Sequence, residues 1–129
     1  MKPILAATGL ILAATGGAQA LSLKASWGSA AGCGGQSPAF VLGAVPKGTA
    51  KLDFKMVDLD LPSYPHGGGS VAFAGKSSFA AGEVFGAFSS YRGPCPPPGQ
   101  THRYEWSVQA IDAAGKVLGT AKTVLPFKR

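Results

Sequence analysis

The most constraining feature of the sequence is a strict alternation of apolar and polar residues between positions 103 and 111. Tyr104, Trp106, Val108 and Ala110 occupy the even positions, and the odd positions before 111 carry arginine, glutamate, serine and glutamine. Because successive side chains of a β-strand point to opposite faces, this pattern is typical of a strand with one buried face. A chain that contains such a strand must supply a second layer to cover it.

Further strands are indicated by other short segments that alternate or are apolar throughout. They are separated by stretches rich in glycine and proline, which number 19 and 10 in the chain. No segment after the first 20 residues keeps the helical period of 3.6. We therefore expect an all-β domain, packed as a β-sandwich or an open barrel. The expected strands are at residues 21–27, 39–42, 52–57, 71–74, 84–88, 103–111 and 116–124.

The first 20 residues are typical of an export signal. Lys2 precedes an apolar run at residues 4–14, and Ala-Gln-Ala at 18–20 is a suitable cleavage site. Residues 21–129 then form one domain, because the remaining length suffices for only one core. No later segment has the ~20 apolar residues of a membrane helix. We expect a periplasmic or secreted protein with a cleaved signal peptide and no transmembrane segment.

The two cysteines of the chain, Cys33 and Cys95, favour a disulfide in an exported protein. It would close a loop of about 60 residues and stabilise the fold by about 4 kcal/mol in the chain-entropy model. Two alternatives stay open. Ala-Ala-Gly-Cys at 30–33 resembles a lipidation site, and Cys95 could be a thiol nucleophile beside a histidine.

The net charge is +6, yet only 14% of the residues are charged and the lysines form no dense run. Scattered charge of this kind is typical of a solvated surface and argues against a nucleic-acid-binding patch. A weak attraction to anionic lipids or other polyanions stays compatible with it.

Nearly all reactive groups lie in two loops, at residues 58–66 and 91–104, and each contains one of the chain's two histidines. A zinc site would use Asp58, Asp60, His66 and His102, but their spacing matches no common metal motif. No serine lies in the strained turn of a nucleophile elbow. The remaining functional interpretation is an anion pocket, in which imidazoles, a tyrosine and the backbone N–H groups of Gly93 and Gly99 hold a phosphate or carboxylate. The spacing of these residues fits equally well two loops that close the end of the sandwich with ordinary hydrogen bonds.

Both loops resemble signatures of the phosphatidylethanolamine-binding protein family, including its bacterial Raf-kinase-inhibitor-like branch. The first is Asp-Leu-Asp-Leu-Pro at 58–62 followed by His66, and the second is Gly-Pro-Cys-Pro-Pro at 93–97 followed by His-Arg-Tyr at 102–104. Three further segments match in order, namely Cys-Gly-Gly-Gln-Ser-Pro at 33–38, Val-Pro-Lys-Gly-Thr at 45–49 and Ala-Ile-Asp at 110–112.

The resemblance implies an antiparallel β-sandwich of about seven to nine short strands. It also implies a pocket at one edge that binds phosphate-type anions or phospholipid head groups. By position, the pocket would be lined by Asp58, Tyr64, His66, Gly93, Pro94, His102 and Tyr104. The loop would be shaped by Asp60, Pro62 and Pro96. The family's fold also brings the segments of Cys33 and Cys95 together.

No cofactor, metal ion or catalytic step is expected from the resemblance. A second hypothesis is an inhibitor or interaction module that contacts a kinase, a protease or another protein through the pocket edge. In either case we expect a monomer or a weak dimer that does not bind nucleic acid.

The sequence departs from the family at Leu59, where relatives carry proline, and at residues 67–69, which are three glycines. The connection from His66 to Gly93 is short, and the family's long C-terminal helix is not expected after the last strand. These departures predict a shallow, open pocket. Whether a proline of the two loops is cis is left open.

Protein recovered from an oxidising compartment is expected to contain no reduced cysteine. Alkylation without reductant, followed by mass spectrometry, should leave Cys33 and Cys95 unlabelled, whereas prior reduction should label both. Two labelled cysteines in the unreduced sample would contradict the disulfide.

Overall fold

The computed structural model describes residues 19–28, 32–86 and 89–129. The proposed export signal lies outside this part of the chain, apart from its last two residues. The described residues form seven strands and no helix, and consequently no helix that could span a membrane. The strands are β1 (Ser22–Ser26), β2 (Ala39–Gly43), β3 (Thr49–Asp58), β4 (Gly68–Ala72), β5 (Ser78–Phe79), β6 (Thr101–Asp112) and β7 (Val117–Lys128).

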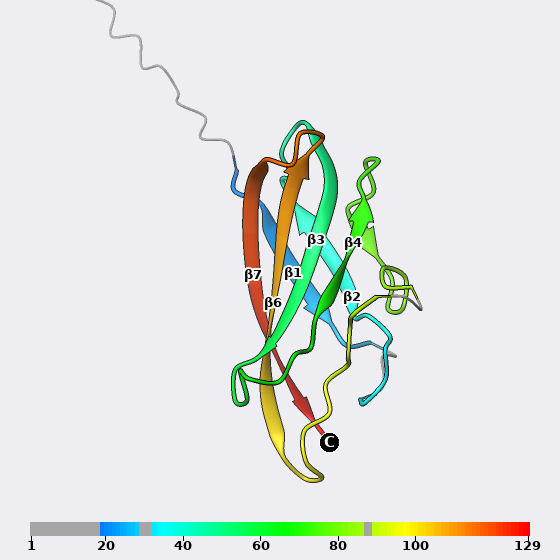
Figure 1. Ribbon diagram of the computed structural model, residues 1–129, viewed down its shortest axis with the longest axis vertical. Helices are drawn as coiled ribbons and strands as arrows, with labels where there is room; N and C mark the ends of the chain where they lie inside the picture. Colours follow the sequence, from blue (N-terminus) through cyan, green and yellow to red (C-terminus); the bar gives the residue numbers. More distant parts are fainter. Residues whose placement is uncertain (1–18, 29–31, 87–88) are drawn as a thin grey trace, which may run out of the picture.

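The strands form two antiparallel sheets that pack face to face (Figure 1). The smaller sheet has the order β1-β2-β5, and the larger has the order β4-β3-β6-β7. The long hairpin of β6 and β7 runs along most of the molecule; β1 crosses behind it, and β2 crosses behind β3 (Figure 1). The expected all-β sandwich and its number of strands are confirmed.

The core consists of the inward-facing residues of β3 and β6 and the aromatic rings that cover them. Along β6, Tyr104, Trp106 and Val108 are completely buried, as their alternation predicts. Phe40 of β2 stacks on Phe54 of β3 at 4.4 Å between ring centroids and meets Trp106 edge-on at 5.0 Å. These contacts join the two sheets, because aromatic pairs add a geometric preference to the burial of their area.

The β6–β7 hairpin is fixed by a turn whose sequence predicts it. Asp112 Oδ1 accepts hydrogen bonds from the N–H groups of Ala114 and Lys116, at 2.9 and 2.8 Å. Gly115 has a φ of 86°, a conformation that glycine adopts without steric cost. This turn joins the two strands that were expected at residues 103–111 and 116–124.

Two expectations about the strands are wrong. The segment expected as a strand at residues 84–88 is not a strand over its described part, residues 84–86. Its Val84 and Phe85 side chains are instead buried in the core, where the Phe85 ring stacks on Trp106. A short apolar run cannot reveal whether its backbone pairs with a sheet. Conversely, β4 begins at Gly68, within the three glycines, and not at residue 71 as expected. Glycine is needed at 68 because a Cβ there would collide with the Phe54 carbonyl. The short strand β5 was not expected either.

Three chain segments meet at one end of the sandwich (Figure 1): the loop that follows β3, the segment that precedes β2 and the loop that leads into β6. The disulfide between Cys33 and Cys95 joins the last two, across 62 residues of sequence, and confirms the expected pairing. Beside it, the Cys33 N–H donates to the Pro94 carbonyl at 2.8 Å. This end therefore holds both histidine-bearing loops.

Replacing Phe40 with alanine is expected to destabilise the fold by about 3–5 kcal/mol, because it leaves a cavity between the sheets. The free energy of unfolding in urea measures this. Val41 is the matched control, since it follows on the same strand but is 51% exposed. Val41→Ala should cost below about 0.5 kcal/mol. Equal losses in the two variants would contradict the described packing.

Candidate functional site

Asp58 is the last residue of β3 and the centre of the candidate site. Its pairing opposite Tyr104 places it at the end of the sandwich, and its exposed fraction is only 3%. One carboxylate oxygen, Oδ1, accepts hydrogen bonds from the N–H groups of Asp60 at 2.8 Å and Leu61 at 3.1 Å. Aspartate often organises a turn in this way. The carboxylate thereby fixes the path of the loop that carries Tyr64 and His66.

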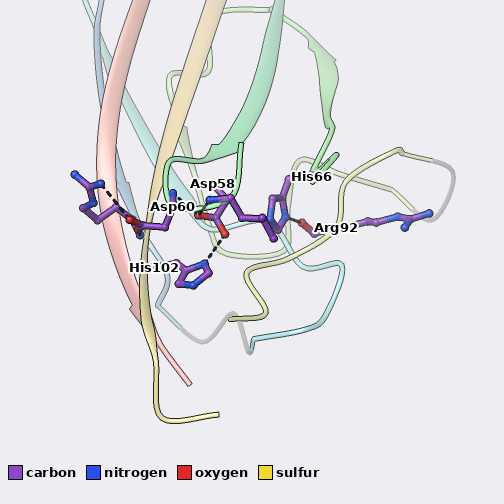
Figure 2. Close-up of polar contacts among 7 residues, drawn as sticks. Asp58, Asp60, His66, Arg92 and His102 are labelled. Carbon is purple, nitrogen blue, oxygen red and sulfur yellow. Dashed lines mark hydrogen bonds and ion pairs between the residues drawn. The ribbon is translucent and has the colours of Figure 1, made fainter. Parts of the chain in front are cut away.

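His102, on β6, is held by the other oxygen of the same carboxylate. Its Nδ1 lies 2.6 Å from Asp58 Oδ2, and Figure 2 shows the two side chains turned toward one another. Since a carboxylate accepts hydrogen bonds, Nδ1 carries the proton and donates it. The His102 side chain is 14% exposed, so the ring is partly accessible. Its Nε2 is the nitrogen that remains for a ligand.

His66 is anchored differently, because its ring is bonded to the backbone of Arg92 and not to Asp58 (Figure 2). Its Nδ1 is 2.7 Å from the Arg92 carbonyl oxygen, so this nitrogen also donates. The ring is 3% exposed and lies between two tyrosines, with centroids 4.6 Å from Tyr64 and 5.4 Å from Tyr104. As in His102, the fixed Nδ1 leaves Nε2 as the second polar atom of the ring.

The hydroxyl of Tyr104 is buried, and no hydrogen bond of good geometry reaches it among the described residues, although Asp58 and the backbone of Cys95 lie near it. Burial, together with the nearby charge of Asp58, raises the pKa of Tyr104 to about 12. The Tyr91 hydroxyl is also buried and unpartnered in this part of the chain, and burial followed by the proximity of Tyr104 raises its pKa. Both phenols are therefore protonated at neutral pH and can donate a hydrogen bond.

Gly93 and Pro94 are buried and connect the site to the disulfide. The N–H of Gly93 donates to the Gly34 carbonyl at 2.7 Å, and the N–H of Gly99 donates to the Arg129 carbonyl at 2.9 Å. The expectation that these two N–H groups are available to an anion is therefore wrong, because tertiary backbone contacts already use them. Glycine is nonetheless required at 93, since a Cβ would collide with the Gly34 carbonyl.

Asp60 ties the first loop to β6. Its Oδ2 accepts from the Arg103 N–H at 2.7 Å, and its Oδ1 accepts from Arg103 Nη2 at 3.1 Å. These hydrogen bonds lower the pKa of Asp60. Of the other two loop-shaping candidates, Pro96 is fully buried and Pro62 is exposed. No peptide bond of the described residues is cis.

A cavity of about 250 Å³ lies beside the disulfide, between the segment before β2 and the two histidine-bearing loops. Tyr64 and Gly93 line it, as do Tyr91 and Arg92, which sequence reasoning did not select. Their position immediately before the Gly-Pro segment was the available signal. Figure 2 shows the Arg92 side chain extending away from Asp58 and both histidines. A larger hollow of about 620 Å³ elsewhere is lined by none of the expected site residues.

The alternative of a metal site finds no support in the geometry. In residues 19–28, 32–86 and 89–129, no group of three or more histidine, cysteine, aspartate or glutamate side chains is placed to hold a metal ion. Asp60 turns to Arg103, and His66 turns to the Arg92 carbonyl. Both cysteines are in the disulfide.

Comparison with known proteins gives a consistent result. The family model described as phosphatidylethanolamine-binding protein matches residues 66–127. A solved structure from Chlamydia trachomatis, described as a phosphatidylethanolamine-binding protein homologue, superimposes with a TM-score of 0.64 at 20% identity. The match covers 85% of this chain and 98% of that one. YbcL of Escherichia coli, described as a new member of the mammalian family, gives 0.56 at 19%, covering 74% and 82%. None of the curated proteins compared matches the sequence.

At these identities the structural likeness concerns the fold, while the family model matches the sequence of the second histidine-bearing loop and the β6–β7 hairpin. Residues 66–127 thus resemble the phosphatidylethanolamine-binding protein family in sequence, and the chain shares the fold of solved structures described as members of it. This resemblance supports a small binding protein. The bacterial branch and the roles of individual residues stay predictions.

The two buried tyrosines predict a loss of stability at high pH. In the unfolded chain both titrate near the ordinary value of 10.0, whereas the folded state keeps them protonated to higher pH. Their contribution to the free energy of unfolding is therefore full below pH 10 and falls as the pH rises toward about 12. Urea unfolding across this range measures the fall, which should be smaller in Tyr104→Phe. An unchanged slope in that variant would contradict the assignment.

Proposed function

We propose that the protein is a small exported binding protein for phosphate-type anions, including phospholipid head groups, and that it catalyses no reaction. The observation that carries this proposal is the buried, unpartnered hydroxyl of Tyr104 beside the two histidines. A buried polar group without a partner costs about 1–3 kcal/mol. A ligand oxygen that accepts from this hydroxyl would recover that cost.

The two imidazoles supply the remaining donors. Each of them uses Nδ1 inside the protein, His102 toward Asp58 and His66 toward the Arg92 carbonyl. On protonation, each Nε2 becomes a donor of a charge-assisted hydrogen bond, which is the stronger kind. An anion with several oxygens, such as phosphate, can accept from two imidazoles and one phenol at once. Phosphate should therefore bind more tightly to the form of the protein in which both imidazoles are protonated.

Asp58 serves as a positioning residue in this proposal. Its carboxylate holds the His102 ring and the loop backbone, so its charge is partly directed into the protein. For a zwitterionic head group such as phosphoethanolamine, the same charge would attract the ammonium while the histidines and Tyr104 bind the phosphate.

The absence of catalysis and the export of the protein belong to the same proposal. The Asp58–His102 pair has no serine or cysteine as a hydrogen-bond partner in the described part of the chain, and a nucleophilic mechanism needs one. The disulfide is compatible with an oxidising compartment, and the leader sequence points to the same location.

Phosphate and phosphoethanolamine are expected to shift backbone amide resonances of the two histidine-bearing loops in NMR titrations. Tyr104→Phe should weaken phosphate binding by about three- to tenfold, the loss of one hydrogen bond. His66→Ala and His102→Ala should weaken it further at pH 6. Lys122→Ala, which removes a positive charge on the outer face of β7, is the control and should bind normally. Absence of localised shifts in the wild type would disprove the pocket.

A second candidate function is an interaction module that contacts a protein through the pocket edge. The observation in its favour is that Leu61 and Tyr64, in the first loop, are 47% and 41% exposed. Capture of a partner from periplasmic extract, with and without competing phosphate, separates the two functions. Capture that is insensitive to phosphate but lost in Leu61→Ser would favour the interaction module.

A further inference from the structure

The disulfide between Cys33 and Cys95 is accessible to small molecules from the surface. Both cysteines are exposed, and both line the cavity of about 250 Å³ at the end of the sandwich. A thiolate that exchanges with a disulfide must reach one of its sulfurs, so access is the first requirement. Exposed disulfides are accordingly the labile or regulatory ones. The position of this disulfide therefore permits exchange in the folded protein.

A cation beside one of the two sulfurs makes the pair asymmetric. Arg129 Nη1 lies 3.8 Å from Cys95 Sγ, within hydrogen-bond distance of a sulfur. The backbone of Arg129 is fixed, because its N–H donates to the Gln100 carbonyl at 3.2 Å and its carbonyl accepts from the Gly99 N–H at 2.9 Å. No ion pair of the described residues uses this guanidinium. It is therefore placed to stabilise the negative charge on Cys95 when the S–S bond breaks.

The other sulfur belongs to a residue with an unfavourable backbone conformation. Cys33 has a φ of 64°, in the left-handed region that residues other than glycine adopt at a cost. Such a conformation persists only where the surroundings enforce it. Here the disulfide and the hydrogen bond from the Cys33 N–H to the Pro94 carbonyl hold the residue. Breaking the S–S bond removes one of these constraints, so Cys33 is the cysteine better able to accept a new substituent.

The charge of the cavity favours a thiol that is itself negatively charged. The described residues that line the cavity include Arg92, which is exposed, and no acidic side chain. No salt bridge in the described part of the chain neutralises Arg92. A positive charge beside a reactive group raises the local concentration of an anionic reagent and lowers that of a cationic one. An anionic thiol should therefore reach this disulfide faster than a cationic thiol of equal reactivity.

We propose that Cys33 and Cys95 form an exchange site for an anionic low-molecular-weight thiol, which becomes attached to Cys33. The thiolate attacks Cys33 Sγ, a new S–S bond forms there, and the bond to Cys95 breaks. Cys95 leaves with the electron pair, as a thiolate beside Arg129. The number of disulfide bonds is unchanged, so the step needs no oxidant and no reductant other than the thiol. Attack by Cys95 on the mixed disulfide restores the original bond and releases the thiol.

The fold keeps the two sulfurs near one another after the bond between them has broken. The Gly93 N–H donates to the Gly34 carbonyl at 2.7 Å, in addition to the hydrogen bond of Cys33, so the two segments stay joined. The segment of Cys95 is also held by His66, whose carbonyl accepts from the Arg92 N–H at 2.7 Å. Exchange should therefore be local and reversible, and it should not require unfolding of the sandwich.

The test measures exchange of the oxidised protein with three monothiols that differ in charge. Glutathione is anionic, 2-mercaptoethanol is neutral and cysteamine is cationic. Rapid alkylation stops the reaction, and peptide mapping by mass spectrometry locates the attached thiol. We expect the thiol on Cys33 and the alkyl group on Cys95. Attachment mainly to Cys95, or no mixed disulfide with any of the three thiols, would overturn the proposal.

Two variants separate the roles of the two arginines, each compared with the wild type for the same thiol. Arg129→Gln should slow exchange with neutral 2-mercaptoethanol by about threefold, because the departing sulfur loses its cation. Arg92→Gln should slow glutathione by about threefold, accelerate cysteamine and leave 2-mercaptoethanol unchanged. Lys116→Gln removes a charge from the turn at the other end of the β6–β7 hairpin and should change none of the rates. An unchanged rate in Arg129→Gln, or an equal effect of Arg92→Gln on all three thiols, would contradict the proposal.

A last measurement distinguishes local exchange from exchange through the unfolded chain. Phe40→Ala destabilises the core, so it should accelerate exchange by about a hundredfold or more if the sandwich must unfold first. Local exchange leaves the rate close to that of the wild type, and the larger acceleration would overturn the proposal. None of these measurements contains phosphate. Failure of the proposed anion pocket would therefore leave their results unaffected.

Discussion

The pairing register of β3 against β6 is the constraint on which the rest of the structure depends. It places Phe54 opposite Val108 and Met56 opposite Trp106, so that both strands contribute to one buried face. The same register carries Asp58 to a position opposite Tyr104. A slip by one residue would turn every inward side chain to solvent, and it would also separate the aspartate from His102. Core and candidate site are therefore two results of one alignment of strands.

The sequence predicted the parts of the fold that depend on local pattern. The alternation of β6, the turn at Asp112 and the strand that ends at Asp58 each have a signal within a few residues. Features set by distant contacts were not predictable. The Phe85 ring packs on Trp106, which lies far along the chain, and its backbone forms no strand. Gly68 pairs at the start of β4, where the backbone of Phe54 passes too close to admit a Cβ.

The candidate site shows the same division between local and distant information. The resemblance of short motifs located both histidines, Asp58 and Tyr104, and the structure brings their side chains together. It could not show that the N–H groups of Gly93 and Gly99 are already occupied, since their acceptors lie on remote segments. In the proposed pocket, the donors would thus be side chains of fixed orientation rather than loop backbone. Such an arrangement costs little reorganisation on binding.

The disulfide divides the chain unequally. Its ring runs from Cys33 to Cys95 and contains β2, β3, β4 and β5, whereas β6 and β7 follow after it. Of the two central strands of the larger sheet, β3 is therefore inside the covalent ring and β6 is outside it. For a chain that emerges from a translocation channel from its N-terminus, both sulfurs arrive before β6 does. The disulfide can thus form before the β6–β7 hairpin is available to pair with β3. The hairpin, which carries His102 and Tyr104, is then held in the sandwich by noncovalent contacts and not by a disulfide of its own.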